Sequence, residues 1–139
     1  MEKDKQPADQ TTPLGTINKV TEAINGGDMT SMLSMFEPDA VLVVQALAGQ
    51  SGQTAKGIDA IREAYKGFFS LKPDLHREAQ HIVDAGNVAL HCSRWTLTAT
   101  APDGKKIERT AHSSDVLRRQ PDGRWLVVIY NPYGTSIVA

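Results

Sequence analysis

The sequence has little cysteine and no excess of either charge. Its one cysteine, Cys92, has no partner for an internal disulfide, so the fold must be stable without that cross-link. Lys and Arg together number 15 and Asp and Glu together 16. This balance argues against a nucleic-acid-binding protein, which needs a clustered basic face.

The sequence also lacks long apolar runs. No run approaches the roughly 18 residues that a membrane-spanning helix needs. Residues 1–15, MEKDKQPADQTTPLG, lack the apolar core of a signal peptide. We therefore expect a soluble protein with no membrane association and a cytoplasmic location.

The N-terminal half has the spacing of helices around one buried strand. Residues 1–12 are polar and are expected to form a flexible tail. A helix is predicted from Thr11 or Thr12 to about residue 25, and a short second helix after Asp28, which can cap it. Residues 40–44 (AVLVV) predict a buried strand, residues 48–55 a loop, and a third helix follows Gly57.

The C-terminal half predicts four strands, over residues 75–84, 88–100, 105–119 and 124–130. The last three are joined by Pro-Asp-Gly turns at residues 102–104 and 121–123, a strong hairpin signal. Helices followed by a run of strands predict an α+β fold. We expect a curved antiparallel sheet packed on three N-terminal helices, with a pocket between them.

Three segments in this order resemble a known family: FEPDAVLV (residues 36–43), GIDAI (57–61) and DVLRRQPDGRW (115–125). Together they resemble the SnoaL-like branch of the nuclear transport factor 2 superfamily, which also contains ketosteroid isomerase and the association domain of a calmodulin-dependent kinase. The resemblance implies one SnoaL-like domain over residues 13–139. It also implies a cone-shaped sheet, an internal pocket and, usually, a homodimer.

The resemblance implies only part of the isomerase's catalytic set. The isomerase's base falls on Val44 and its main oxyanion tyrosine on Val20, and neither valine can perform that chemistry. Asp115 lies where the isomerase keeps a protonated acid, and Tyr65 where it keeps a supporting tyrosine. Arg94 lies where the kinase association domain has an arginine.

Which side chains share a face depends on the length of the two turns. If Thr100 pairs with Lys105 and Arg119 with Arg124, then Arg94, Asp115 and Tyr130 face the pocket together. The resemblance favours this register. It makes Asp115 and Tyr130 the candidate catalytic residues, and Arg94 and Tyr65 the candidate ligand-binding residues.

The alternative register has three-residue turns with a bulged glycine, which moves each side chain to the other face of its partner strand. Asp115 would then share a face with His91 and Trp95, while His112 would accompany Arg94 and Tyr130. In the favoured register Trp95 and Trp125 lie on the opposite face of the sheet. An identical chain would have to cover them, which predicts a homodimer through that face.

No residue pattern indicates a metal site or a bound cofactor. The four histidines lack metal-ligand spacing, and His76 and His81, an odd number of residues apart on one strand, are expected to face opposite ways. Residues 52–57 have the glycine spacing of a phosphate loop but lack the Lys-Ser/Thr that follows it. We therefore expect no metal and no cofactor.

These patterns favour a pocket protein that binds a small hydrophobic or anionic molecule. One hypothesis adds catalysis without a cofactor, as an isomerase, cyclase or dehydratase in which Asp115 acts as acid or base. The missing base at Val44 favours binding alone. The alternative is a homo-oligomerisation module whose sheet face pairs identical chains.

Overall fold

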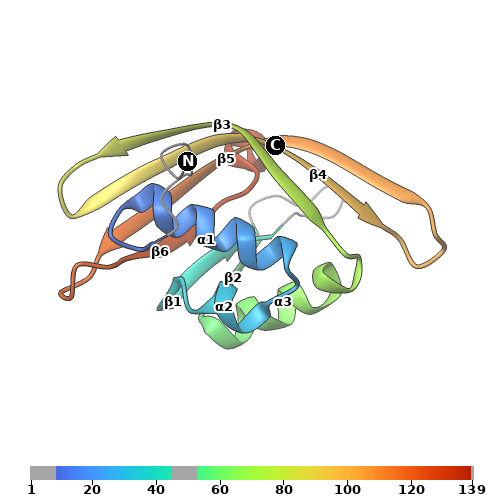
Figure 1. Cartoon of the computed structure of the whole chain (residues 1–139), viewed down its shortest axis with the longest axis horizontal. Coiled ribbons are helices and arrows are strands. Elements are labelled where there is room, and N and C mark those ends of the chain that lie inside the picture. Colours follow the sequence, from blue (N-terminus) through green and yellow to red (C-terminus); the bar gives the residue numbers. More distant parts are fainter. Residues whose placement is uncertain (1–8, 45–52, 139) are drawn as a thin grey trace, which may run out of the picture.

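A curved sheet arches over three helices in the computed structural model, which describes residues 9–44 and 53–138 (Figure 1). The helices are α1 (Pro13–Asn25), α2 (Met29–Leu33) and α3 (Ile58–Ser70). The strands are β1 (Phe36–Val43), β2 (Thr54–Lys56), β3 (Asp74–Asp84), β4 (Val88–Thr100), β5 (Lys106–Arg119) and β6 (Trp125–Tyr130), and a 3₁₀ helix, η2, follows (Gly134–Ile137). The predicted α+β class and the single curved sheet are confirmed.

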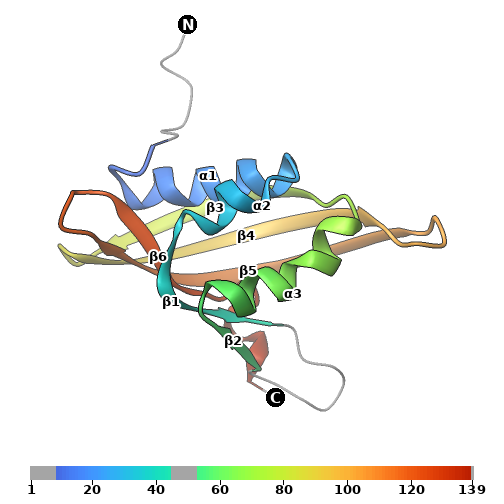
Figure 2. The same cartoon turned by 90° about the horizontal axis from the view of Figure 1, so that it is seen from below.

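Helix α1 begins and ends where the sequence predicts. The side chain of Thr12 accepts a hydrogen bond from the backbone N–H of Gly15 at 2.9 Å, and Pro13 occupies the first turn. Ile17 and Val20 are fully buried against the concave face of the sheet, and burial of each contributes about 1.5–3 kcal/mol. Figure 2 shows α1 and α3 lying across this face.

The predicted N-terminal tail (residues 1–12) is described only from Asp9 onward. There the chain contacts the sheet, because the carbonyl oxygen of Gln10 accepts a hydrogen bond from the backbone N–H of Trp125 at 2.7 Å. The predicted loop over 48–55 likewise lies mostly outside the described residues, and its end forms β2. None of the helices in the described ranges has the length and hydropathy needed to cross a bilayer.

The strand order is β2-β1-β6-β5-β4-β3, and every pair is antiparallel except β1 with β6. The expectation of a wholly antiparallel sheet is therefore wrong at this one pair. Only strands joined by a tight hairpin must run antiparallel. Most of the chain separates β1 from β6, so their relative direction is free of that constraint.

The favoured register between the long strands is wrong. Thr100 pairs with Lys106 and not with Lys105, and Arg119 pairs with Trp125 and not with Arg124. The backbone N–H of Ala101 donates to Lys105 at 2.8 Å and that of Gln120 to Arg124 at 2.7 Å, so the turns are residues 102–104 and 121–123. Each ends in a left-handed glycine, with φ of 87° at Gly104 and 89° at Gly123. Only glycine adopts this conformation freely, so the glycine sets the length of each turn and the register that follows it.

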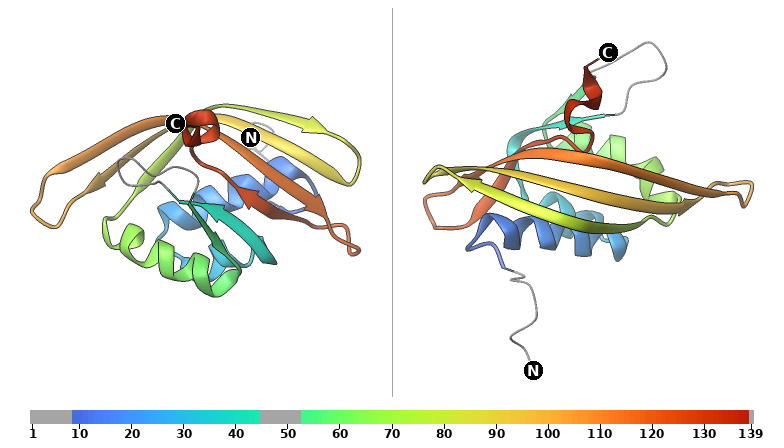
Figure 3. Two further views of the ribbon diagram at one scale, coloured as in Figure 1. Left: turned by 180° about the vertical axis from the view of Figure 1, so that it is seen from behind. Right: turned by 90° about the horizontal axis from the view of Figure 1, so that it is seen from above.

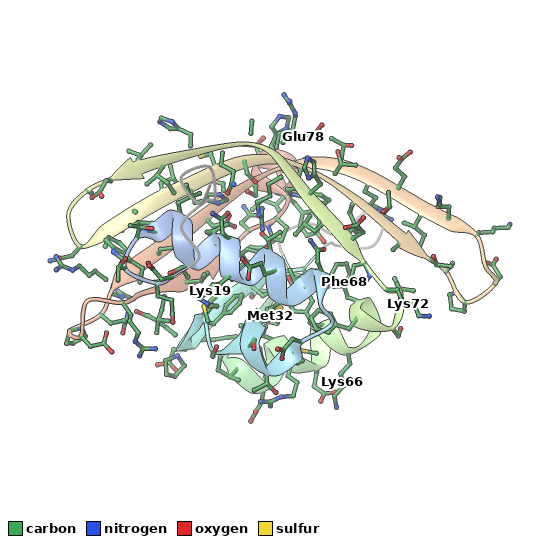
Figure 4. The ribbon with its side chains drawn as sticks, viewed as in Figure 1. Lys19, Met32, Lys66, Phe68, Lys72 and Glu78 are labelled. Carbon is green, nitrogen blue, oxygen red and sulfur yellow. The ribbon has the colours of Figure 1, made fainter. Side chains whose placement is uncertain are left out.

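This register places Arg94 on the outer, convex face of the sheet. Arg94 pairs with His112 across β4 and β5, whereas His91 pairs with Asp115 on the inner face. The guanidinium Nε of Arg94 lies 3.6 Å from Glu78, and its side chain is 51% exposed. Glu78 is labelled on the side of β3 that faces away from the helices (Figure 4). The expectation that Arg94 faces the pocket is therefore wrong.

Two β-bulges change which residues share a face. The first lies where β5 pairs with β6: Leu117 opposes Val127 but Val116 opposes Ile129, so β6 has one extra residue, Val128. Continuing this pairing by one residue sets Tyr130 beside Asp115. Asp115 therefore shares the inner face with His91, as the alternative register predicts, and also with Tyr130, as the favoured one predicts.

The second bulge lies between Arg77 and Ala79 on β3. It places both His76 and His81 on the outer face, where they oppose Thr96 and Cys92. Their expected opposite orientation is therefore wrong, because the extra residue of a bulge reverses the alternation of side chains.

Trp95 and Trp125 are each only 5% exposed and belong to the core of a single chain. The expectation that they lie on the outer face of the sheet is therefore wrong, since the observed register turns Trp95 inward. Viewed from above, none of the described helices α1, α2 and α3 covers the convex face of β3, β4 and β5 (Figure 3).

Candidate ligand pocket

A pocket of about 190 Å³ lies between α3 and the inner face of the sheet. Residues from α1, β1, α3, β3, β4, β6 and the turn after β6 contribute to it. Phe68, labelled in Figure 4, reaches it from α3. The lining residues are Ile24, Leu42, Val43, Val44, Ala64, Tyr65, Phe68, Leu75, Arg77, Trp95, Leu97, Tyr130, Pro132 and Tyr133.

The lining is mostly apolar and rich in aromatic rings. All three tyrosines of the chain belong to it, together with Phe68 and Trp95. The rings of Trp95 and Tyr133 meet edge to face with centroids 6.4 Å apart, and those of Tyr65 and Phe68 lie 5.3 Å apart. A concave, largely apolar pocket with a few polar groups is the usual form of a small-molecule site.

Arg77 is the one lining residue among those described that carries a formal charge at neutral pH. It follows Leu75 by two positions on β3, so both side chains face inward. Its guanidinium donates three hydrogen bonds: Nε to Thr21 Oγ1 (2.9 Å), Nη1 to Ser93 Oγ (3.0 Å) and Nη2 to Tyr130 Oη (2.6 Å).

The partners of Arg77 are neutral hydroxyl groups from α1, β4 and β6. Ser93 is bonded in turn to Ser113, with 2.6 Å between the two Oγ atoms. No carboxylate of the described residues forms an ion pair with Arg77. The guanidinium is therefore held in place by neutral groups, and no described carboxylate lies within ion-pair distance of it.

The polar end of the pocket offers hydrogen-bond donors. A guanidinium has five N–H groups and no acceptor, and three of those of Arg77 bind the hydroxyls above. Tyr130 accepts from Arg77, so its own O–H proton is directed elsewhere. Burial raises the pKa of Tyr130 against the opposing effect of Arg77, and the phenol therefore remains a donor at neutral pH.

The other two phenols have the same protonation state. Burial raises the pKa of Tyr65 well above its usual value, and the nearby Tyr130 and Tyr133 raise it further. Burial also raises the pKa of Tyr133. At neutral pH the phenols are uncharged. Arg77 lowers the pKa of Tyr65 and Tyr130, whereas the nearby charge of Asp115 raises both.

The four predicted site residues are divided among three places. Tyr65 and Tyr130 line the pocket. Asp115 is fully buried beneath it and is not part of its lining, and Arg94 lies on the outer face. Sequence reasoning missed Arg77, although the alternation from Leu75 along the predicted strand places it on the inner face.

Asp115 is sealed in a polar network of its own. Its Oδ2 lies 2.7 Å from His91 Nδ1, and its Oδ1 accepts a hydrogen bond from the backbone N–H of Asn131 at 2.8 Å. The other ring nitrogen of His91 lies 2.9 Å from Gln80 Oε1. The side chains of His91 and Asp115 are both 0% exposed.

The described part of the pocket lining contains no Asp, Glu or His, so it has no carboxylate or imidazole that could remove a proton from a ligand. In residues 9–44 and 53–138, no three His, Cys, Asp or Glu side chains are close enough to hold a metal ion. What the pocket offers chemically is a cation, phenolic O–H groups and apolar surface.

Comparisons with known proteins agree with this architecture. A ketosteroid isomerase-like protein from Erwinia carotovora atroseptica superposes with a TM-score of 0.73 at 21% identity, covering 91% of this chain and 94% of that one. A nuclear transport factor 2-like superfamily protein from Salmonella enterica gives a TM-score of 0.68 at 21% identity, covering 89% and 90%. A cystatin-like, NTF2-like protein from Novosphingobium aromaticivorans gives 0.65 at 17% identity, covering 83% and 74%.

At this level of identity the solved structures show a shared fold. No curated protein matches the sequence significantly. The profile of the SnoaL-like domain, however, matches residues 17–128, which is most of the chain. The chain therefore belongs to the SnoaL-like family, with the fold of the nuclear transport factor 2 superfamily.

Proposed function

We propose that the protein binds a small molecule with a largely apolar body and one negatively charged oxygen group, such as a carboxylate. The observation that carries this proposal is the guanidinium of Arg77. It lies in a mostly apolar pocket and is bonded to neutral hydroxyls. A ligand anion would form the direct ion pair that no described carboxylate makes with Arg77.

The donor arrangement favours an oxyanion over a neutral polar group. Arg77 and Tyr130 offer N–H and O–H protons, and a carboxylate is an acceptor-only group. Hydrogen bonds to a charged partner contribute about 1.5–3 kcal/mol each, more than bonds between neutral groups. The apolar walls and aromatic rings would bind the remainder of the ligand by excluding water.

Binding without catalysis agrees better with the pocket than an isomerase, cyclase or dehydratase does. Those reactions need a positioned acid or base that reaches the ligand. The nearest buried carboxyl candidate, Asp115, has both oxygens occupied by His91 and Asn131 and is shielded from the pocket. Tyr130 remains the candidate for direct contact with the ligand, as a donor.

The test compares 2-naphthoate with its neutral isostere 2-naphthamide by titration calorimetry. We expect the wild-type protein to prefer naphthoate, and Arg77→Met to lose this preference, a change of about 10- to 100-fold. Arg94→Met is the matched control, because it removes the same charge from the outer face. Equal affinity of the two probes for wild type, or an equal effect of the two substitutions, would contradict the proposal.

Association of identical chains is a second candidate function, favoured by the outer face of the sheet. There Val83, Leu90, Val116 and Ile129 oppose one another in turn across β3, β4, β5 and β6 and form an apolar row, here named the outer row. Val83 is 50% exposed and Ile129 38%. Two-fold pairing would bury such a row.

Light scattering at micromolar concentration tests this association. We expect a dimer for the wild-type protein and a shift toward monomer when Val83→Glu introduces a charge into the outer row. Asp39→Glu, an exposed substitution on β1, is the control. A wild-type monomer would argue against association through this face.

A further inference from the structure

We propose that Asp115 and His91 are positioning residues that hold one wall of the pocket, and do not exchange protons with the ligand. The wall is the turn Asn131–Gly134, here named the pocket turn. Two of its residues, Pro132 and Tyr133, line the pocket. The inference concerns the shape of the pocket and rests on the proposed function only where it predicts affinity.

Asp115 anchors the first residue of the pocket turn. Its Oδ1 accepts the backbone N–H of Asn131 at 2.8 Å, and the backbone N–H of Ser114 donates to the carbonyl oxygen of Asn131 at 2.8 Å. The side chain of Asn131 then closes the turn. Its Oδ1 accepts from the backbone N–H of Tyr133, and its Nδ2 donates to the carbonyl oxygen of Gly134, each at 3.1 Å.

The pocket turn is tied to the sheet at a second point. The indole Nε1 of Trp95 donates to the carbonyl oxygen of Pro132 at 2.8 Å, and the Trp95 and Tyr133 rings are in contact. The positions of Pro132 and Tyr133 therefore depend on Asp115 at one end and on Trp95 in the middle. The indole N–H of Trp95 reports directly on where the turn lies.

His91 fixes the orientation of the Asp115 carboxyl group. The imidazole lies between Asp115 Oδ2 at 2.7 Å and Gln80 Oε1 at 2.9 Å, so both of its nitrogens face acceptors. Gln80 is in turn bonded to Asn18 of α1 at 3.4 Å. The network thus joins α1 and β3 to the pocket turn through two side chains with no exposed surface.

This arrangement predicts that an amide can replace the Asp115 carboxylate. In Asp115→Asn the amide oxygen can still accept from Asn131, and the amide N–H can donate to His91 Nδ1. His91 then needs one proton, on Nε2, for its bond to Gln80. A catalytic acid or base would not survive this change, whereas a positioning residue would. In Asp115→Leu the Asn131 N–H and His91 both lose their partner.

The experiment measures hydrogen exchange at the two indole N–H groups by NMR. The chain has two tryptophans, so Trp125 serves as an internal control. We expect exchange at Trp95 to accelerate about tenfold or more in Asp115→Leu and to stay near wild type in Asp115→Asn. The affinity for 2-naphthoate should fall in the first variant and persist in the second. Asp39→Leu, on the exposed surface of β1, is the control substitution.

Gln80→Met provides a milder perturbation if Asp115→Leu fails to fold, since Gln80 is half-buried and Met is close to it in size. It removes the acceptor of His91 Nε2 and should also accelerate exchange at Trp95. Unchanged Trp95 exchange in a folded Asp115→Leu or Gln80→Met variant would overturn the inference. The inference would also be overturned if Asp115→Asn accelerated exchange at Trp95 as much as Asp115→Leu does. The indole readout needs no ligand, so it stands even if naphthoate binds no variant.

Discussion

Replacement of Gly134 by alanine should destabilise the protein more than the same change at any turn glycine with free space around it. Gly134 has φ of 52°, and a Cβ atom built on it would lie 2.7 Å from the carbonyl oxygen of His112 on β5. Real Cβ atoms do not approach backbone oxygens this closely. The new Cβ atom is attached directly to the backbone of the pocket turn, and the oxygen it meets belongs to the backbone of β5. Either the pocket turn or strand β5 must therefore move.

The size of the effect follows from two contributions. A left-handed residue other than glycine costs about 1 kcal/mol or slightly more. Displacing well-packed backbone adds about 1–3 kcal/mol. We therefore expect Gly134→Ala to lower the free energy of unfolding by about 2–4 kcal/mol, which for a chain of this size is a fall of about 5–15 °C in Tm.

Substitutions at two other glycines distinguish the cost of the left-handed conformation from the cost of the close contact. Gly123 has φ of 89° and open space around its Cβ position, so Gly123→Ala should show the conformational cost alone. Gly67 lies in α3 with nothing within 4 Å, and Gly67→Ala should stabilise the protein by about 0.5–1 kcal/mol. Urea unfolding of the three variants is the assay. A Gly134→Ala variant no less stable than Gly123→Ala would refute the reasoning from the close approach to His112.

Two further predictions concern pH. The hydrogen bond from Arg118 lowers the pKa of Glu37, so their interaction stabilises the fold above the usual glutamate pKa and is lost as pH falls through the lowered value. In urea unfolding near pH 7, the free energy of unfolding of wild type should exceed that of Glu37→Gln by about 0.5–1 kcal/mol. An undiminished difference at about pH 3 would contradict this. Burial raises the pKa of Tyr130, so calorimetric affinity for 2-naphthoate should stay constant from about pH 6 to about pH 9, while Tyr130→Phe weakens it about 3- to 10-fold. A loss of wild-type affinity within that range would argue against a phenol donor.

The elements of the fold could be predicted because their ends carry local signals. Thr12 and Pro13 start α1, and the glycines of the two Pro-Asp-Gly turns end the hairpins, so the predicted bounds of the long strands agree within one residue. The pairing of β1 with β6 is between segments far apart in the chain. No local signal reports its direction, and the parallel arrangement was not predictable from spacing.

The composition of the site was harder to predict because it depends on single-residue shifts. Pro-Asp-Gly is compatible with turns of different length, and one residue more or less turns Arg94 outward or inward. No glycine near Val116 indicates the bulge there, yet this bulge turns Tyr130 inward, onto the same face as Asp115. Resemblance to the kinase association domain places an arginine on β4, whereas in this chain the pocket arginine is Arg77 on β3.

The hydrogen bonds of Arg77 link the pocket to the stability of the fold, so a thermal-shift measurement can detect its ligand. Thr21, Ser93 and Tyr130 belong to α1, β4 and β6, so the guanidinium joins the helical layer to two strands from inside the pocket. A molecule that binds there stabilises the folded chain by mass action, by about 2.7 kcal/mol at a concentration one hundred times its Kd. A thermal-shift screen of small carboxylates, with Arg77→Met run in parallel, would therefore separate true pocket ligands from compounds that stabilise both proteins alike.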